Sequence, residues 1–181
     1  MALYATSAFA ANTAGTIEFV SYSDGGAPTF DSQFEVNDNG SALVGVSGSV
    51  INLVKQASGY QGYALGRFLD VTCTATHCTD NGSAQLDITV TPVADGYSLS
   101  GTLNFVFVNA TVTASKISLS AEGANTDVGF ELDADSAGNY SGDGTDGYGT
   151  FTATLTTGGS LAGLTDPATF VALMVNPFVG N

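Results

Sequence analysis

Positive charge is what this chain of 181 residues has least of. It contains three basic residues, Lys55, Arg67 and Lys116, against 17 acidic ones, which gives a formal net charge of −14. A surface of that sign repels phosphate backbones and anionic lipid, so we expect neither nucleic acid nor a membrane surface as a partner. Because only 11% of the residues are charged, most of the surface must be serine, threonine, asparagine and glycine. That profile is typical of secreted and cell-surface β-proteins.

Residues that carry catalysis are also scarce. His77 is the only histidine, and no Gly-x-Ser-x-Gly motif accompanies it, so a hydrolase triad has little to be built from. Carboxylates are plentiful, but nothing in their spacing pairs two of them for glycoside cleavage. No apolar run reaches the ~18 residues of a membrane-spanning helix. We therefore expect neither an enzyme nor membrane insertion.

Cysteine occurs twice, at Cys73 and Cys78. In an oxidising compartment the two thiols can close a short disulfide loop, and in a reducing compartment they stay free. We predict the disulfide. A loop this small constrains the unfolded chain less than a long one, so its main role would be to fix a local turn.

What the chain does have is alternation of apolar and polar residues, the pattern of a half-buried β-strand. It is clearest at Leu86, Ile88 and Val90. After a turn at Asp95-Gly96 a second strand is predicted to run through Val108, buried on both faces where it ends. The apolar residues that share its first parity are Tyr97, Leu99, Leu103, Phe105 and Phe107.

Alternating segments and turn signals recur every ~8–12 residues, which predicts about nine or ten short antiparallel strands with little or no helix. The expected fold is therefore all-β, an antiparallel β-sandwich or jelly roll, in one domain over residues 16–181. The stretch Phe170–Val175 fits either a short helix that begins at Asp166-Pro167 or a buried last strand. We expect the strand.

The N-terminal segment, residues 1–15, reads as a signal-like tail or an assembly segment. Met1–Ala10 ends in Ala-Phe-Ala, which fits the small-x-small cleavage rule of secretory signals and predicts an exported, extracellular protein. Together with Gly15–Phe19 it resembles the mature start of chaperone–usher fimbrial pilins. In that family an N-terminal extension completes the sandwich of the next subunit. The resemblance implies that Thr16, Ile17 and Phe19 belong to an assembly strand.

The acidic, glycine-rich stretch Asp133–Gly149 is the candidate for a ligand site. Its hard oxygen donors suit calcium, the candidate cofactor. Those donors are Asp133, Asp135, Asn139, Asp143 and Asp146. The alternative is a solvated loop whose aspartates and glycines serve turn geometry. Two tyrosines of the same stretch, Tyr140 and Tyr148, are candidates for stacking on sugar rings.

Two functions follow from these observations. The first is a secreted structural subunit of a fibre, pilus or biofilm matrix, which self-associates into a filament by β-strand complementation or acts in cell adhesion. The second is an extracellular module that binds glycans or calcium.

Overall fold

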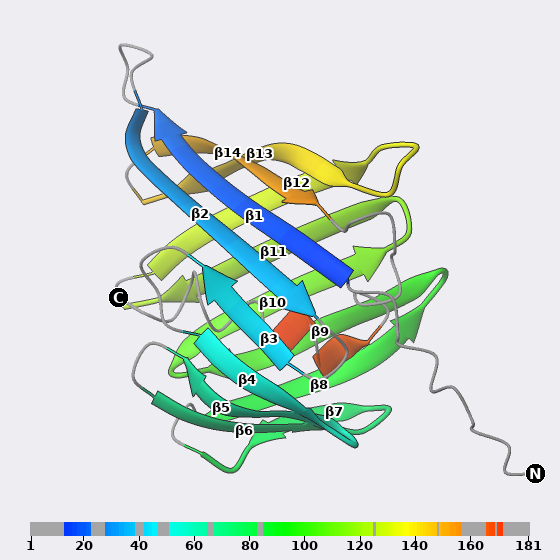
Figure 1. The fold of residues 1–181 in the computed structure, drawn as a ribbon. Coiled ribbons are helices and arrows are strands. Elements are labelled where there is room, and N and C mark those ends of the chain that lie inside the picture. Colours follow the sequence, from blue (N-terminus) through cyan, green and yellow to red (C-terminus); the bar gives the residue numbers. More distant parts are fainter. Residues whose placement is uncertain are drawn as a thin grey trace, which may run out of the picture.

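A computed structural model of the protein describes residues 13–22, 28–38, 42–46, 51–64, 67–82, 85–124, 126–147, 149–156, 166–168 and 170–171. Almost all of these residues lie in fourteen antiparallel β-strands (Figure 1). In chain order they are β1 (Thr13–Tyr22), β2 (Pro28–Asp38), β3 (Ala42–Val46), β4 (Ile51–Gln56), β5 (Gly59–Ala64), β6 (Arg67–Cys73), β7 (His77–Asp80), β8 (Leu86–Val93), β9 (Gly96–Leu103), β10 (Val106–Thr113), β11 (Lys116–Gly123), β12 (Thr126–Ala134), β13 (Tyr140–Asp146) and β14 (Gly149–Thr156). Within the described ranges no helix has the length and apolar character needed to cross a membrane.

The strands form one sheet that closes on itself. Each strand pairs with its neighbours in sequence, and β1 pairs with both β2 and β14, which completes a barrel. At the closure Ile17 lies opposite Leu155 on one side and opposite Phe34 on the other. Closure of an up-and-down sheet satisfies the backbone hydrogen-bonding groups that an edge strand would leave open.

Alternation places apolar side chains inside the barrel and polar ones outside. In β8, Leu86, Ile88 and Val90 are buried while Asp87 and Thr89 are exposed. The same pattern continues through β9, β10 and β11. The buried side chains from β4 to β14 form one continuous apolar core. Burial of each large aliphatic or aromatic side chain contributes about 1.5–3 kcal/mol, so this lining is the main stabilising term of the barrel.

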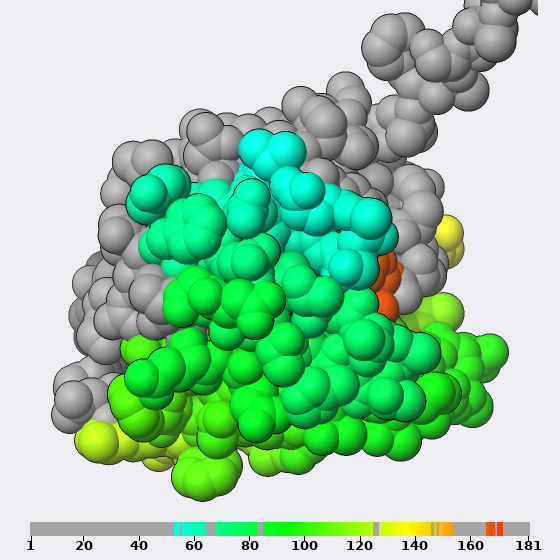
Figure 2. Space-filling view, turned by 90° about the horizontal axis from the view of Figure 1, so that it is seen from below, coloured from blue at the N-terminus to red at the C-terminus, as the bar shows by residue number. Residues whose placement is uncertain are grey.

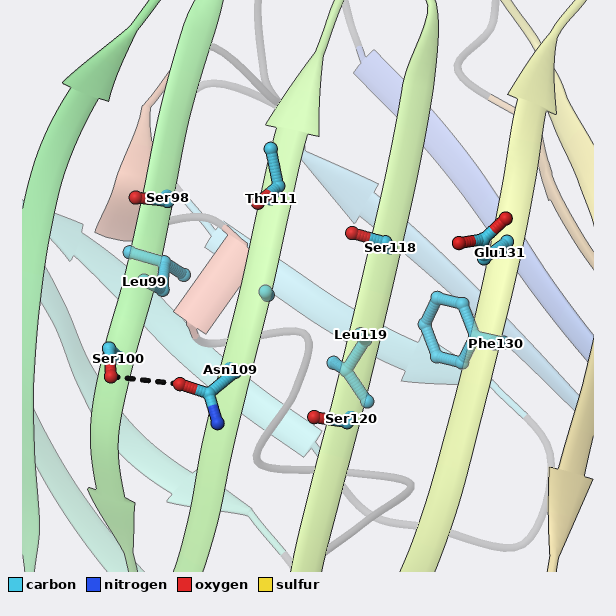
Figure 3. A pocket seen from close by; sticks show the side chains of 11 residues that line it. Ser98, Leu99, Ser100, Asn109, Thr111, Ser118, Leu119, Ser120, Phe130 and Glu131 are labelled. Atoms are coloured by element: carbon cyan, nitrogen blue, oxygen red, sulfur yellow. Dashed lines mark hydrogen bonds between the residues drawn. The ribbon is translucent and has the colours of Figure 1, made fainter.

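A short helical turn lies inside the barrel, between the wall of β1–β4 and the wall of β9–β12 (Figures 1 and 3). Asp166 begins it: its Oδ1 accepts a hydrogen bond from the Ala168 amide at 3.0 Å, and its carbonyl accepts one from the Phe170 amide at 3.4 Å. Ala168, Phe170 and Val171 are buried. Pro167 suits the first helical position, where no amide donor is needed. The strand expected from Phe170 is wrong at residues 170–171, which are helical. The capping hydrogen bonds of Asp166 favour the helical turn over a strand.

The expected sandwich or jelly roll differs from the observed single sheet for a physical reason. Alternation says which face of each strand is buried, and two facing sheets bury the same residues as one sheet that curls round. The count of nine or ten strands was also too low. The strand expected from Tyr97 through Val108 is the hairpin β9–β10, and Tyr140–Asp146, expected as a loop, is β13. The N-terminal strand β1 begins at Thr13, inside the expected tail.

Candidate functional site

Several large apolar side chains are exposed on the described part of the molecule, and two phenylalanines are the most exposed of them. Phe105 is 76% exposed and Phe107 is 66% exposed, the highest values among the large apolar side chains that the structure describes. Both belong to the β9–β10 hairpin. The strands from β5 to β10 form a continuous outer surface in the space-filling view (Figure 2). Apolar side chains gathered on a monomer surface often mark a binding site.

The hairpin geometry explains why these two rings face outward. Leu103 pairs directly with Val106, so Asn104 and Phe105 form a two-residue turn. Both turn residues have positive φ, 49° at Asn104 and 68° at Phe105, as a type I′ turn requires. Val106 then resumes the inward parity, which leaves Phe107 on the outer face.

Phe105 is an unfavourable residue for its position in the turn. Left-handed backbone costs an L-residue about 1–2 kcal/mol, and glycine is the usual second residue of such a turn. A mostly exposed ring recovers little of that cost by packing. Backbone strain of this kind is concentrated at ligand sites. Because phenylalanine stands where glycine would fit without strain, its ring is the feature that points to a ligand at this turn.

The two rings line a hollow of about 490 Å³, which we call the phenylalanine groove. Its lining residues are Gln85, Leu86, Asp87, Thr102, Phe105 and Phe107. The Asp87 carboxylate is held from the neighbouring strand by His77, whose Nε2 lies 3.1 Å from Oδ1. The groove therefore combines aromatic rings with an amide, a hydroxyl and a positioned carboxylate.

A second hollow of about 410 Å³ lies further along the same strands, and we call it the serine furrow (Figure 3). The polar side chains that line it are Ser98, Ser100, Asn109, Thr111, Ser118, Ser120 and Glu131. They come from β9, β10, β11 and β12. Ser100 donates a hydrogen bond from Oγ to Oδ1 of Asn109 at 2.8 Å. Small hydroxyl side chains make this part of the wall shallow and rich in hydrogen-bonding groups.

The charge of the furrow is set by one ion-pair cluster at its margin. Lys116 Nζ lies 3.0 Å from Glu131 Oε2 and 3.6 Å from Asp133 Oδ1. The hydrogen bond to Glu131, with the charge of Asp133, raises the pKa of the Lys116 ammonium. The one described basic side chain beside the furrow is thus already neutralised.

Among the five residues predicted to bind calcium, those whose side chains the structure describes do not form a common cluster. Asp133 is exposed at the end of β12 and pairs with Lys116, while Asp143 is exposed on β13 opposite Glu131. Asp146 also lies on β13, but its side chain is outside the described set. No group of three or more acidic, cysteine or histidine side chains suited to a metal occurs among the described residues.

Asp135 and Asn139, the remaining two, lie together and shape the β12–β13 turn. Asp135 Oδ1 accepts hydrogen bonds from the amides of Ala137 at 2.8 Å and Asn139 at 2.9 Å. The Asn139 side chain also donates to Asp135 Oδ2 at 3.3 Å. Hydrogen bonds from Asn139 hold the pKa of the Asp135 carboxyl below its ordinary value. These hydrogen bonds give the carboxylate a role in turn geometry.

Tyr140 is not a stacking residue. Its side chain is 1% exposed, and its hydroxyl donates a hydrogen bond to the Thr113 carbonyl at 2.8 Å. Burial raises the pKa of the phenol. The prediction failed because Tyr140–Asp146 is a strand, in which Tyr140 has inward parity. Tyr148, its expected partner, lies outside the described residues.

The predicted assembly residues lie in the barrel closure. Thr16, Ile17 and Phe19 are in β1, which is paired along its length with β2 and along most of it with β14. The disulfide between Cys73 and Cys78 is confirmed, and it joins paired positions at the β6–β7 turn. Met1–Ala10, the signal-like segment, lies outside the described residues.

The sequence reasoning missed the phenylalanine groove because Phe105 and Phe107 share parity with the buried Leu103. A usable signal was present: Val106, Val108, Ala110 and Val112 supply an apolar run on the opposite parity. A change of apolar parity inside a continuous alternation indicates a two-residue turn, and Asn104 is a residue that tolerates positive φ.

No family model, curated protein or solved structure matches this chain. The resemblance to fimbrial pilins therefore stays a prediction, and the function has to be argued from the site itself.

Proposed function

We propose that the protein is an extracellular glycan-binding module, and that the phenylalanine groove is its sugar site. The observation that carries the proposal is the pair of exposed rings, Phe105 and Phe107, on a hairpin with a two-residue turn. A pyranose ring has an apolar face of C–H groups, which packs on an aromatic ring, and a rim of hydroxyls, which need polar partners.

The groove supplies both kinds of contact. Asp87 and Gln85 offer hydrogen-bond acceptors, while Gln85 and Thr102 also offer donors, all beside the two rings. The carboxylate of Asp87 is oriented by His77, so less freedom is lost when a ligand binds. Sugars are recognised by this combination of apolar stacking and oriented polar groups.

The carboxylates around the groove favour a neutral glycan over an acidic one. Asp87 lines the groove, and Glu122 lies directly opposite Phe107 on β11. The net charge of −14 adds long-range repulsion of anions. A neutral glycan fits these surroundings, whereas a uronate or sulfated polymer meets carboxylates at close range.

The experiment is isothermal titration calorimetry against a panel of neutral oligosaccharides, with Phe107→Thr as the test variant. Threonine suits an exposed strand position, so the fold is expected to persist. We expect at least a tenfold loss of affinity, since an aromatic contact is worth about 0.5–1.5 kcal/mol beyond its buried area. Tyr63→Thr removes another exposed aromatic, from β5, and serves as the matched control.

Two results would contradict the proposal. One is that the wild-type protein shows no heat of binding with any oligosaccharide of the panel. The other is an equal loss in Phe107→Thr and Tyr63→Thr, which would place the sugar elsewhere.

Filament formation by strand complementation remains a prediction of a different class. It would require β1 to leave its own barrel, because the Ile17 region is hydrogen-bonded on both sides within the chain. Electron micrographs of the purified protein with and without residues 1–15 test it, and filaments from the truncated chain would rule out donation from that segment.

Calcium binding is tested in the same calorimeter with CaCl₂.

A further inference from the structure

We propose that the ligand is a linear polymer of uncharged sugars that lies along β10, with one sugar on the phenylalanine groove and the following sugars in the serine furrow. This inference rests on the proposed glycan function and names the form of its ligand. The two hollows lie on the outer face of the same two strands, β9 and β10.

Continuity of the two hollows follows from strand register. Phe107, Asn109 and Thr111 are alternate residues of β10, so all three side chains point outward, with steps of roughly 6.6–6.8 Å between them. On β9 the opposite residues are Thr102, Ser100 and Ser98, and on β11 they are Glu122, Ser120 and Ser118. The phenylalanine groove and the serine furrow are therefore consecutive rows of one surface.

The chemistry changes along that surface in the way an extended glycan requires. The first row has an aromatic ring for stacking. The next two rows have hydroxyl and amide groups, and Figure 3 shows the hydroxyls of Ser98, Ser118 and Ser120 along the outer face. A single sugar on the ring would not reach the hydroxyl and amide groups of the next two rows.

A glycine of the next strand lies beside the furrow, opposite one of the serines that line it. Gly129 on β12 pairs with Ser120, and it has the outward parity of Glu131. A Cβ built there meets only the Leu119 carbonyl at 3.6 Å, an ordinary contact, so the fold leaves room for a side chain. The absence of one widens the furrow beside Ser120.

The charged residues at the furrow favour an uncharged polymer as the ligand. Glu131 lines the furrow and Lys116, the adjacent cation, is already paired with it. None of the residues that line the furrow is basic, so none of them can receive a uronate or sulfate group. A neutral polymer meets no charge repulsion here, since sugar hydroxyls can donate hydrogen bonds to carboxylate, hydroxyl and amide oxygens.

The test measures affinity against chain length. Neutral β-linked oligosaccharides of two to six sugars, from cello-, manno-, xylo- and N-acetylated chito-series, are titrated into the wild-type protein, with oligouronates as the charged arm. We expect affinity for the neutral series that binds to rise about tenfold or more between two and four sugars, as two or more hydrogen bonds are added. Oligouronates should bind at least tenfold more weakly at equal length.

Gly129→Thr is the variant that separates the furrow from the groove. Threonine favours the strand and projects into the furrow, while Phe105 and Phe107 are untouched. It should remove the gain from each sugar added beyond the first and leave binding of the corresponding monosaccharide unchanged. Gly147→Thr, in the β13–β14 turn where a Cβ meets no atom within 4 Å, is the matched control and should behave as wild type.

The outcomes distinguish this inference from the function on which it rests. Binding that is lost in Phe107→Thr but is independent of chain length and of Gly129→Thr overturns the furrow and keeps the groove. Tighter binding of oligouronates overturns the uncharged polymer. No binding of any oligosaccharide overturns the glycan function, and the furrow with it.

Discussion

Replacement of Phe105 by glycine should make the protein slightly more stable while it weakens ligand binding. Phe105 has a φ of 68°, and relief of that left-handed strain is worth about 1–2 kcal/mol. Against it stand about 0.5–1 kcal/mol for the greater freedom of glycine in the unfolded chain, and ~0.5 kcal/mol for the buried quarter of the ring. The difference is centred on a gain of about 0.25 kcal/mol and ranges from a loss of about 0.5 kcal/mol to a gain of about 1 kcal/mol.

The assay is urea unfolding of Phe105→Gly and wild type, with the thermal midpoint as a second readout. For a chain of this length, about 0.25 kcal/mol corresponds to a rise of about 0.5–1 °C in Tm. Calorimetry with the best oligosaccharide should show a loss of affinity in the same variant. A loss of more than about 1 kcal/mol of stability would refute the reasoning, because it would mean that the ring is packed and holds the hairpin. Phe107→Thr, at ordinary strand geometry, is the control without strain.

Three further predictions concern the barrel itself. Tyr140→Phe should lose about 1 kcal/mol of unfolding free energy, measured in urea, because it removes a buried hydrogen bond. The double variant Cys73→Ser with Cys78→Ser should lose about 2 kcal/mol, the loop entropy of so short a disulfide, and an unchanged midpoint would contradict this. Burial holds the phenol pKa of Tyr97 and of Tyr140 above the ordinary value of about 10. The folded state then binds more protons than the unfolded state, so stability should fall as the pH rises above about 10, and tyrosinate absorbance should rise with unfolding.

How much the sequence predicts depends on whether the signal is local. Alternation at Leu86, Ile88 and Val90 identified a strand and its buried face, because burial on one face imposes a period of two. The disulfide followed from two cysteines close in the chain. Closure of the sheet did not follow, since it depends on pairing between Ile17 and Leu155, which are far apart in sequence. No local pattern encodes such a contact.

The residues of the candidate site could not be predicted either, because a short turn decides which side chains face outward. Tyrosines in a glycine-rich stretch led to the prediction of a glycan ligand stacked on Tyr140 and Tyr148, but register turns Tyr140 inward. Phe105 and Phe107 were taken for core because hydrophobic residues on a common parity normally are. Only the turn at Asn104 reverses that assignment, and a turn of one or two residues is the feature that alternation specifies least.

The most direct measurement is the calorimetric titration of one neutral oligosaccharide series into wild type, Phe107→Thr and Gly129→Thr. Wild-type affinity is predicted to increase with chain length, Phe107→Thr to weaken binding at every length, and Gly129→Thr to abolish only the increase. Identical isotherms for the three proteins, or no heat from any sugar, would contradict glycan recognition on this face of the barrel.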